Sequence, residues 1–329
     1  MIVWCTVSTA RPKSLLAEAA RLYYIEGLGQ EAIARKLSMT RSNVSRVLRA
    51  ARDTGIVQVS IRDLSRHDEL LEQELQDRFD LSVAAVAAPT PAGGGLGGVA
   101  ALGAEVVVES IATANIAAIS WGTTLQAVVE AISPIDLPNV ELVQLVGGLV
   151  SFDARATAHD LVRELAQRTG ARYRYLNSPA VFDSPDALRH LVAETSVRET
   201  LDMARRADVA LVGIGSIHSG SSAVLLDLLN LNQAERKDFW GRLPVGDVCG
   251  RYYDAEGRPL DIAFLRERIL AIELKDLRAI PTVVGVAQGR DKTAAVLGAL
   301  RAGLVDVLVC DAVLARSVVD QERGATGTS

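Results

Sequence analysis

The chain has 329 residues, which is too long for one small domain and indicates about two. Its composition, 49% hydrophobic and 23% charged, is ordinary for a globular protein, and no window approaches the ~18 uninterrupted apolar residues of a membrane span. The N-terminal residues lack the basic segment and apolar core of a signal peptide. The three cysteines, Cys5, Cys249 and Cys310, lie far apart, so we expect no disulfide framework, no metal site, no cofactor and a cytoplasmic protein.

Charge is divided unevenly along the chain. Between Arg11 and Arg62 there are ten basic and four acidic residues, a net charge of +6, and the ten residues before them carry no charged side chain. Because the whole chain carries −5, the part after Arg62 carries −11. A basic head on an acidic body predicts a polyanionic partner for the head alone.

Three short helices are predicted in the head. The first ends at Gly27, the second runs from about Gln30 to Leu37, and the third runs from Arg41 to about Arg52 after a tight turn at residues 38–40. Thr40 is a good N-cap for the third helix. Apolar residues on that helix recur at i, i+3, i+4 and i+7 and are expected to face inward: Val44, Val47, Leu48 and Ala51.

Two short helices joined by a tight turn, the second with a polar outer face, are typical of a helix-turn-helix. Arginine can bind guanine in bidentate fashion, asparagine can bind adenine, and serine can bind phosphate or a base edge. The expected DNA-binding residues are Gln30, Thr40, Arg41, Ser42, Asn43, Ser45, Arg46 and Arg49. The alternative is a three-helix packing module with a solvated arginine face. After Gly55, "IVQVSI" alternates like a short strand or wing.

A charged helix follows Arg62, with apolar residues at every fourth position, Leu71, Leu75 and Phe79. It is either a dimer-forming helix or the first helix of the next domain, and we favour the second. The predicted domains are therefore residues 1–62, a DNA-binding domain, and residues 63–329, an effector-binding and oligomerisation domain.

The body alternates between apolar strands and helices. Strands are predicted in "LSVAAVAA", "NIAAISW", "VELVQLVGG", "ARYRYLNSPAVF", "ADVALVGIG", "PTVVGVAQG" and "VDVLVCD", and the glycine-rich "PTPAGGGLGG" is expected to be a surface loop. Apolar strands separated by helices predict an α/β fold with a mostly parallel sheet that is covered on both faces. Ligands of such sheets bind beyond the carboxyl ends of the strands.

Several segments directly after strands have the chemistry of a ligand site. Gly122, Thr123 and Thr124 would bring helix N-terminal amides and two hydroxyls to an anion, unless a threonine only caps the helix. Gly147 and Gly148 would let backbone approach a ligand, or would form a simple turn.

Lys292 is the most specific single candidate for a ligand-binding residue. The body contains only two other lysines, and Lys292 lies at the start of a helix on the expected ligand edge of the sheet. It can neutralise a phosphate, form a Schiff base, or be a solvated loop residue. Asp247 can accept hydrogen bonds from sugar hydroxyls or shape an Asx turn. His218 is more often a surface residue than a ligand or base.

With these motifs in order, the chain resembles the SorC family of bacterial transcriptional regulators from about Leu15 to Val319. The matching segments are "LYYIEGLGQEAIARKLSMTRSNVSRVLRAARDTGIV", "SWGTTL", "LVGG", "NSPAVFDSPD", "ADVALVGIG", "VGDVCGRYYDAEGRPL" and "VVGVAQGRDKTAAVLGALRAGLVDVLVCD". The resemblance implies a winged-helix-like head and a Rossmann-like body related in fold to ribose-5-phosphate isomerase and glucosamine-6-phosphate deaminase. It also implies a sugar effector, often phosphorylated, and a homodimer or homotetramer on operator DNA.

Carried over by motif, Gly122, Thr123 and Thr124 would cradle a phosphate, Asp247 would meet sugar hydroxyls and Lys292 would reach the anion. The family often has Gly-Gly before the lysine, where this chain has Gln288 and Gly289. Gln288 adds a side chain beside the expected ligand, so the effector cannot be transferred from relatives. The leading hypothesis is thus a regulator of carbohydrate catabolism that is not an enzyme. The alternative, a sugar-phosphate isomerase or deaminase, leaves the basic head without a purpose.

Overall fold

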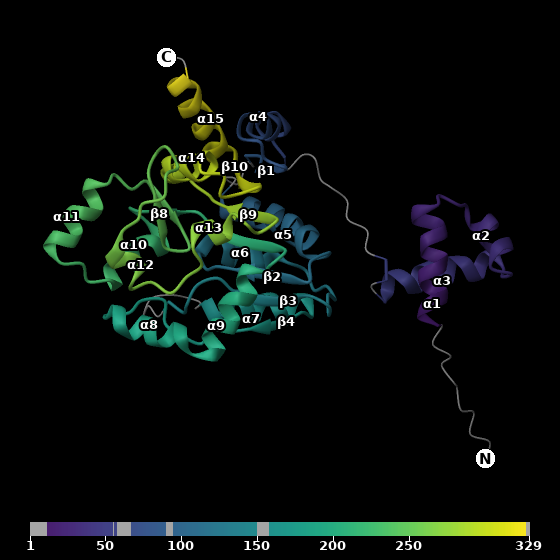
Figure 1. Ribbon diagram of the computed structural model, residues 1–329. Helices are drawn as coiled ribbons and strands as arrows, with labels where there is room; N and C mark the ends of the chain where they lie inside the picture. The colour runs from purple at the N-terminus through teal and green to yellow at the C-terminus, as the bar shows by residue number, and fades with distance from the viewer. Residues whose placement is uncertain (1–11, 55, 58–66, 90–94, 150–157, 327–329) are drawn as a thin grey trace. The chain divides into compact units, whose positions relative to one another are not determined.

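We describe a computed structural model of the chain, shown in Figure 1. The described residues are 12–54, 56–57, 67–89, 95–149 and 158–326. The chain divides into two compact units, residues 1–62 and 63–329, and each is described here by itself.

The first unit is helical. It contains α1 (Lys13–Ala20), the π-helical turn η1 (Arg21–Ile25), α2 (Gln30–Lys36) and α3 (Arg41–Asp53). Gly27, which follows η1, has φ = 67°, a left-handed conformation that ends the helical segment there. The predicted strand or wing falls mostly outside the described residues.

Helix α3 begins and packs as its sequence predicts. The hydroxyl of Thr40 accepts a hydrogen bond from the N–H of Asn43 at 3.2 Å, which caps the helix. The apolar stripe of α3 packs with α1 and α2 into a core of this unit, whose buried side chains are Leu16, Ala19, Ala20, Leu22, Ile33, Ala34, Val44, Val47, Leu48 and Ala51.

The second unit is built on one parallel sheet with the strand order β1-β10-β9-β5-β2-β3-β4. The bounds are Val83–Ala87 (β1), Ile116–Ile119 (β2), Glu141–Gln144 (β3), Arg172–Arg174 (β4), Val209–Gly213 (β5), Thr282–Val286 (β9) and Val307–Asp311 (β10). All seven strands run in the same direction, so the prediction of a mostly parallel sheet is confirmed.

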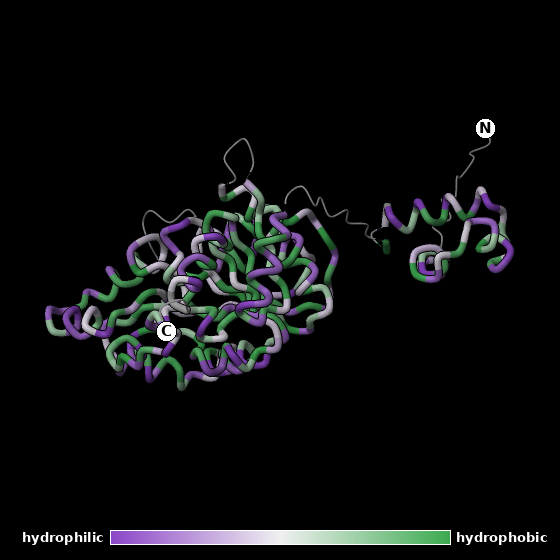
Figure 2. Tube along the Cα trace, turned by 90° about the horizontal axis from the view of Figure 1, so that it is seen from above, coloured by the Kyte–Doolittle hydropathy of each residue, from purple (hydrophilic) through white to green (hydrophobic). Residues whose placement is uncertain are grey.

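Helices cover both faces of this sheet (Figure 1). One face packs against α5 (Leu96–Ile111), α6 (Thr123–Ala131) and α7 (Ala158–Thr169). The other packs against α4 (Glu69–Phe79), α9 (Thr195–Arg205), α14 (Thr293–Arg301) and α15 (Ala312–Thr326). Alternate strand residues enter the two cores, for example Val284 and Val283 of β9. Green, hydrophobic segments accordingly fill much of the interior in Figure 2.

The remaining elements lie between β4 and β9 in the chain. They are α8 (Pro185–Ala193), β6 (Gly215–Ser216), α10 (Gly220–Leu228), α11 (Gln233–Gly241), β7 (Gly246–Val248), β8 (Arg251–Tyr253), α12 (Ala263–Arg266) and α13 (Leu274–Leu277), and the 3-10 turn η3 (Arg290–Lys292) follows β9. Strands β6, β7 and β8 form a small antiparallel sheet that the sequence pattern did not indicate, because strands of two or three residues are too short to show a period.

Two details decide between expectations made from the sequence. Leu71 and Leu75 of α4 are buried in the core of the second unit, so α4 is the first helix of that unit, as we favoured. The glycine-rich segment is only partly a loop: its last residues, from Leu96 to Gly98, form the first turn of α5. Residues 90–94 lie outside the described part of the chain.

The strand order creates a crevice near the middle of the sheet. From β2 the chain adds β3 and β4 on one side, and from β5 it adds β9 and β10 on the other. Loops that leave β2 and β5 therefore diverge to opposite faces, and the space beyond their carboxyl ends is open to a ligand.

Candidate functional site

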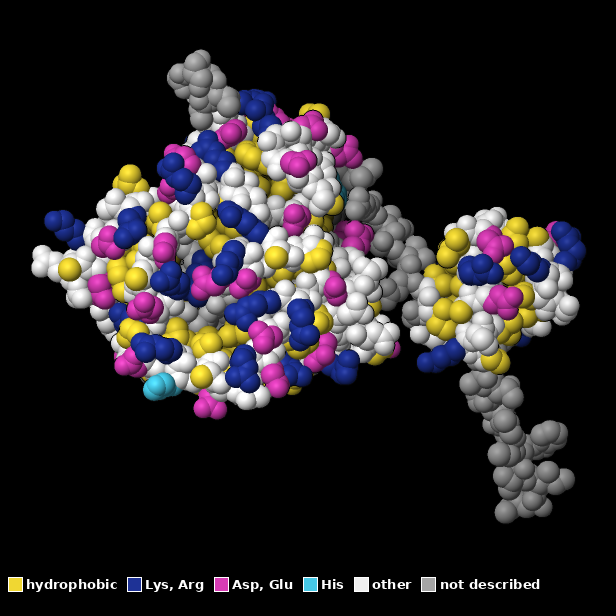
Figure 3. All heavy atoms as spheres, in the orientation of Figure 1, with side chains coloured by type: hydrophobic (Ala, Val, Ile, Leu, Met, Phe, Trp, Pro, Cys, Tyr) yellow, Lys and Arg dark blue, Asp and Glu magenta, His cyan; other side chains and the backbone are white. Residues whose placement is uncertain are grey.

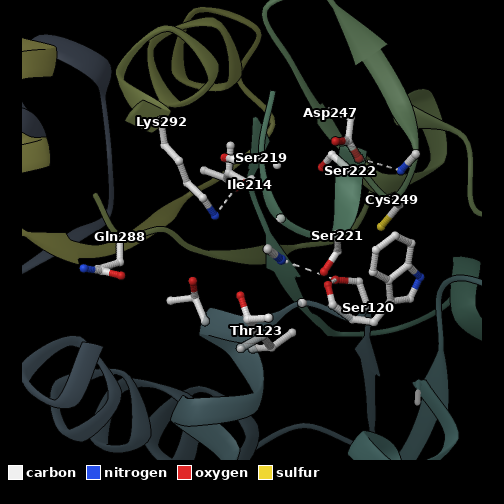
Figure 4. A pocket seen from close by; sticks show the side chains of 18 of the residues that line it. Ser120, Thr123, Ile214, Ser219, Ser221, Ser222, Asp247, Cys249, Gln288 and Lys292 are labelled. Atoms are coloured by element: carbon white, nitrogen blue, oxygen red, sulfur yellow. Dashed lines mark hydrogen bonds between the residues drawn. The ribbon is translucent and has the colours of Figure 1, made fainter. Parts of the chain in front are cut away.

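A cavity of about 240 Å³ lies at this crevice. Its walls come from the segments that follow β2, β5 and β9 and from the β7–β8 turn. The lining residues are Ser120, Trp121, Gly122, Thr123, Thr124, Leu125, Gly213, Ile214, Gly215, Ser219, Gly220, Ser221, Ser222, Asp247, Cys249, Gly250, Gln288, Asp291 and Lys292. Figure 4 shows that hydroxyl, carboxyl, thiol and ammonium groups from different elements line one space.

The N-terminus of α6 forms one wall. Gly122 is its N-cap with φ = 148°, a backbone conformation that side chains disfavour, and no side chain caps the helix. The alternative that a threonine only caps α6 is therefore wrong: Thr123 and Thr124 are its first two helical residues. The free N–H groups of this first turn and the Thr123 hydroxyl are available to an anion.

A second helix N-terminus faces the same cavity and was missed in the sequence. Helix α10 begins at Gly220 without a side-chain cap, and Ser219, Ser221 and Ser222 line the cavity with it. The signal was the run "HSGSS" a few residues after an apolar strand. It was overlooked because β6, two residues long, separates that run from the end of β5.

Lys292 lies where the sequence predicted. It ends η3 just before α14, and its ammonium Nζ donates to the carbonyl of Ile214 at 2.9 Å (Figure 4). Burial lowers the pKa of Lys292, while the carboxylates of Asp291 and Asp247 oppose that shift. The half-buried Lys292 forms no direct salt bridge with a described residue, although the charges of Asp247 and Asp291 act on it.

Of the two interpretations of Asp247, the structure shows the turn-shaping one, and hydrogen bonding to a sugar stays a prediction. One carboxylate oxygen, Oδ2, accepts the N–H of Gly250 at 2.9 Å and shapes the β7–β8 turn. The other, Oδ1, is buried without a hydrogen-bond partner among the described residues. Burial raises the pKa of Asp247, and Ser222, Gly250 and Lys292 oppose the rise. A buried acceptor without a partner is costly, and a ligand hydroxyl would satisfy it.

Close packing holds Asp247 and Ser222 against the β6 strand. A Cβ atom on Gly215 would lie 1.9 Å from the Ser222 hydroxyl and 2.3 Å from Asp247 Oδ1. Glycine is therefore required at this position, because any side chain would displace both polar groups from the cavity wall.

The thiol of Cys249 completes the wall beside Asp247 (Figure 4). Cys249 and Gly250 form the two-residue turn between β7 and β8 with φ = 55° and 71°. Such turns favour asparagine or glycine, so cysteine is strained here. Burial raises the pKa of the Cys249 thiol far above its ordinary value, which keeps it protonated.

Some of the other residues singled out in the sequence line the cavity and others do not. Gln288 lines it, whereas Gly289 is not among its lining residues and donates its N–H to Asp311 at 2.7 Å. His218 is exposed and stacks on Trp240, with ring centroids 5.8 Å apart, as expected of a surface residue.

Gly147 and Gly148 are also absent from the lining of this cavity. A Cβ on Gly147 would lie 2.4 Å from the carbonyl oxygen of Pro179, and one on Gly148 would lie 2.9 Å from the ring of His159. These glycines therefore allow other parts of the chain to pack closely against the backbone. The expectation that they let the backbone approach a ligand is corrected for this cavity.

The predicted DNA-binding residues cluster on the first unit. Ser42, Ser45, Arg46 and Arg49 are exposed on α3, while Gln30 and Asn43 are partly covered at the starts of α2 and α3. Arg41 lies 3.6 Å from Glu31 in an exposed ion pair, and Thr40 serves as the cap. Arg46 and Arg49 form no ion pair with the described residues, so their charges are available to phosphate or bases.

The second unit offers no comparable surface in the view of Figure 3. Basic and acidic side chains are interspersed over the face shown there. In the described part of the chain, no helix has the length and hydrophobicity of a membrane span, and no cluster of His, Cys, Asp and Glu has metal-binding geometry.

Comparison with known proteins agrees with this architecture. The Sugar-bind family model, a sugar-binding domain, matches residues 62–320. The deoxyribonucleoside regulator of Bacillus subtilis strain 168 is 32% identical over 310 residues, which cover 94% of this chain and 98% of that protein. The sorbitol operon regulator of Klebsiella pneumoniae is 30% identical over 301 residues, covering 90% and 94%.

Solved structures show the same fold. The crystal structure of the full-length sorbitol operon regulator SorC from Klebsiella pneumoniae matches with a TM-score of 0.71 and 29% identity, covering 93% of this chain and 98% of that one. These relatives are named as regulators, and the chain is accordingly a transcriptional regulator rather than an enzyme. By sequence and by fold, it belongs to the SorC family of sugar-binding transcriptional regulators.

Proposed function

We propose that this regulator binds operator DNA through α3. When a sugar or phosphosugar occupies the cavity beyond β2 and β5, the protein dissociates from the operator or changes its arrangement on it. One observation carries the effector part of the proposal: two uncapped helix N-termini, the Lys292 ammonium and the unpartnered Oδ1 of Asp247 line a single cavity. The first three groups favour an anion, and the fourth favours a hydroxyl. A sugar phosphate carries both.

The charges of the lining support an effector with a single anionic group. Lys292 is the one cation among the lining residues, beside the carboxylates of Asp247 and Asp291. Asp291 accepts the hydroxyl of Ser219 at 2.9 Å. A molecule with two phosphates would meet two carboxylates and one ammonium, so a monophosphate or a neutral sugar fits this lining better. The side chain of Gln288 would contact the ligand from the cavity wall. Gly289 would act indirectly, by shaping the turn that places Lys292.

The DNA interface is proposed on the first unit. Arg46 and Arg49 would contact bases or phosphates in the major groove, with Ser42, Asn43 and Ser45 beside them, and Gln30, Thr40 and Arg41 would meet the backbone. The net positive charge of the head supports this assignment, because a polyanion would be attracted to this part of an otherwise acidic chain.

Three finer features belong to the same proposal. The body would be related in fold to ribose-5-phosphate isomerase and glucosamine-6-phosphate deaminase, which is consistent with its parallel sheet and its cavity at the strand ends. The working form would be a cytoplasmic homodimer or homotetramer, since two heads are needed for two half-sites. Gly147 and Gly148 would act indirectly, by holding the segment around Pro179.

Thermal unfolding of the purified protein tests the effector. Each phosphosugar is compared with its unphosphorylated sugar, and a ligand at 100 times its Kd should add about 2.7 kcal/mol to stability. Stabilisation by one phosphosugar, with a matching loss or change of operator binding in a gel-shift assay, would support the proposal. Stabilisation by free sugars alone would replace the phosphate by hydroxyl recognition at α6. No stabilisation by any sugar would contradict the effector site.

A further inference from the structure

A second cavity, also of about 240 Å³, adjoins the β7–β8 turn at Gly250 and is open to solvent on one side. It is lined by β8, by the segment that follows it and by α12 and α13. The lining residues are Gly250, Arg251, Tyr252, Pro259, Leu260, Asp261, Ile262, Leu265, Arg266, Glu273, Leu274, Lys275 and Arg278. Only Gly250 is shared with the effector cavity.

A buried arginine with an unused nitrogen lines this cavity. Arg251 Nη2 donates to the carbonyls of Ala271 (3.0 Å) and Ile269 (3.2 Å) and pairs with Glu273 at 2.9 Å, and its Nε donates to Ile272 at 3.3 Å. Its Nη1 has no hydrogen-bond partner among the described residues, although the residue is buried. A guanidinium is always charged, so an unmet N–H donor in this position is costly and would be relieved by an acceptor.

Positive charge is in excess around the cavity. Arg266 is paired with Asp261 at 2.6 Å, whereas Lys275 and Arg278 are exposed and form no ion pair with a described residue. The lining thus contains two more cations than carboxylates, within a unit whose net charge is −11. The effector cavity has the opposite excess, one cation against two carboxylates.

The rest of the wall is apolar, from the side chains of Pro259, Leu260, Ile262, Leu265 and Leu274. A cavity with a few convergent cations and an apolar wall has the composition of a small-molecule site. An inorganic ion would leave the apolar wall exposed, and a neutral sugar would leave the cations unused.

From these contacts we propose that the second cavity is a binding site for a small organic anion, a carboxylate or phosphate that carries a short apolar chain. The anionic group lies toward Arg251, Lys275 and Arg278, and the chain lies along the leucine-rich wall. This site is independent of the sugar effector, because no side chain that contributes to the anion end of the effector cavity contributes to it.

Calorimetric titration of the full chain with hexanoate, acetate and inorganic phosphate tests the site. The double variant Lys275→Gln/Arg278→Gln alters exposed side chains only, and its fold is checked by circular dichroism. We expect wild type to bind hexanoate more tightly than acetate, and the double variant to bind hexanoate about fivefold more weakly. Tighter binding of phosphate than of hexanoate, if it is lost in the double variant and kept in Lys292→Met, would identify a phosphate-bearing ligand for this site.

Two matched controls separate this site from the effector site. Lys237→Gln removes an exposed lysine of α11 that does not line the cavity, and Lys292→Met disables the proposed effector site. Both should bind hexanoate like wild type. The proposal is overturned if wild type shows no binding of any of the three anions up to about 20 mM, a very weak affinity. It is also overturned if Lys292→Met, rather than the double variant, removes the binding.

Discussion

The proposed effector cavity places two oppositely charged groups, Lys292 and Asp247, in surroundings that disfavour their charged forms. Burial lowers the pKa of the lysine and raises that of the aspartic acid. Each side chain makes one structural hydrogen bond, to Ile214 and from Gly250 respectively. The remaining hydrogen-bonding capacity of each side chain is available to a ligand. Substituting Lys292 or Asp247 should therefore weaken effector binding more than it destabilises the fold.

Replacing Lys292 by Met should weaken binding of an anionic effector by about tenfold or more, because a charge-assisted hydrogen bond is lost from a partly buried site. Operator binding without effector should be unchanged. Calorimetric titration and gel shifts measure the two properties. Equal effector affinity in wild type and Lys292→Met would show that the anion lies elsewhere, while Lys237→Met serves as the control for loss of a lysine.

Replacing Asp247 by Asn should change the pH dependence of stability. The raised pKa means that the folded state holds this proton more tightly than the unfolded chain, whose carboxyl titrates near 3.9. The stabilising contribution is complete below that pH and is lost as the pH rises through the folded pKa. Wild type should therefore lose stability relative to Asp247→Asn as the pH rises from about 4.

Urea unfolding of both proteins across this range measures the difference in the free energy of unfolding. The asparagine can still accept the Gly250 N–H, so the turn itself is retained. If wild type keeps or gains stability relative to Asp247→Asn as the pH rises, Asp247 is not disfavoured as a carboxylate.

Cys249 combines a strained backbone with a position in the cavity wall. Asparagine suits its left-handed conformation, so Cys249→Asn should keep or raise stability by about 1 kcal/mol. The amide would nevertheless replace the thiol beside Asp247, and effector affinity should fall or its selectivity change. Thermal unfolding and effector titration on the same samples test both parts. Unchanged affinity for all effectors would remove Cys249 from the recognition surface.

At the scale of elements, two helix termini support the proposed anion site. Helices α6 and α10 have no side-chain cap, whereas Thr40 caps α3 and Asn232 forms a full capping box at the start of α11. A missing cap is not special to the cavity, because α2, α5 and α9 also lack one. What distinguishes α6 and α10 is that their uncapped first turns border the cavity. The two that border the cavity leave their first N–H groups to a ligand.

Helix α3 should carry DNA affinity through its exposed arginines. Arg46→Ala or Arg49→Ala should each cost about 1–3 kcal/mol if the side chain contacts a base, with effector affinity unchanged. Fluorescence anisotropy on a labelled operator measures the loss. Arg189→Ala, on the exposed face of α8, is the matched control. Full operator affinity in both α3 variants would exclude this face as the one that contacts DNA.

At the scale of the whole molecule, charge is separated between the units, +6 in the head and −11 in the body. Each unit has its own hydrophobic core. The head alone then provides attraction to DNA, and the body limits non-specific binding by repelling it.

An assembly with two heads should require a fixed half-site spacing. Inserting five base pairs between operator half-sites turns one half-site to the opposite side of the duplex, and binding should fall sharply. Inserting about ten restores the facing and part of the affinity. Gel shifts with the three operators measure this. Equal binding to all three would indicate heads that bind independently.

The sequence alone determined the helices of the head and the strands of the main sheet, because their signals are local. The inward stripe of α3, from Val44 to Ala51, and the capping Thr40 are visible as spacing and residue type. The apolar strands and their order with the helices predict a covered parallel sheet, and the carboxyl-end rule then directs attention to Gly122, Thr124 and Lys292. Residue type and the family resemblance add Asp247. All four do line one cavity.

The tertiary structure alone decided which loops meet. Strand order brings the starts of α6 and α10 together although about a hundred residues separate them. For this reason the sequence did not predict that Ser219 to Ser222 line the cavity. It also placed Gly147 against Pro179 rather than at the cavity, and left one nitrogen of Arg251 without a partner among the described residues. Local residue patterns specify period and caps, whereas a cavity depends on contacts between segments distant in the chain, for which a single sequence contains no local signal.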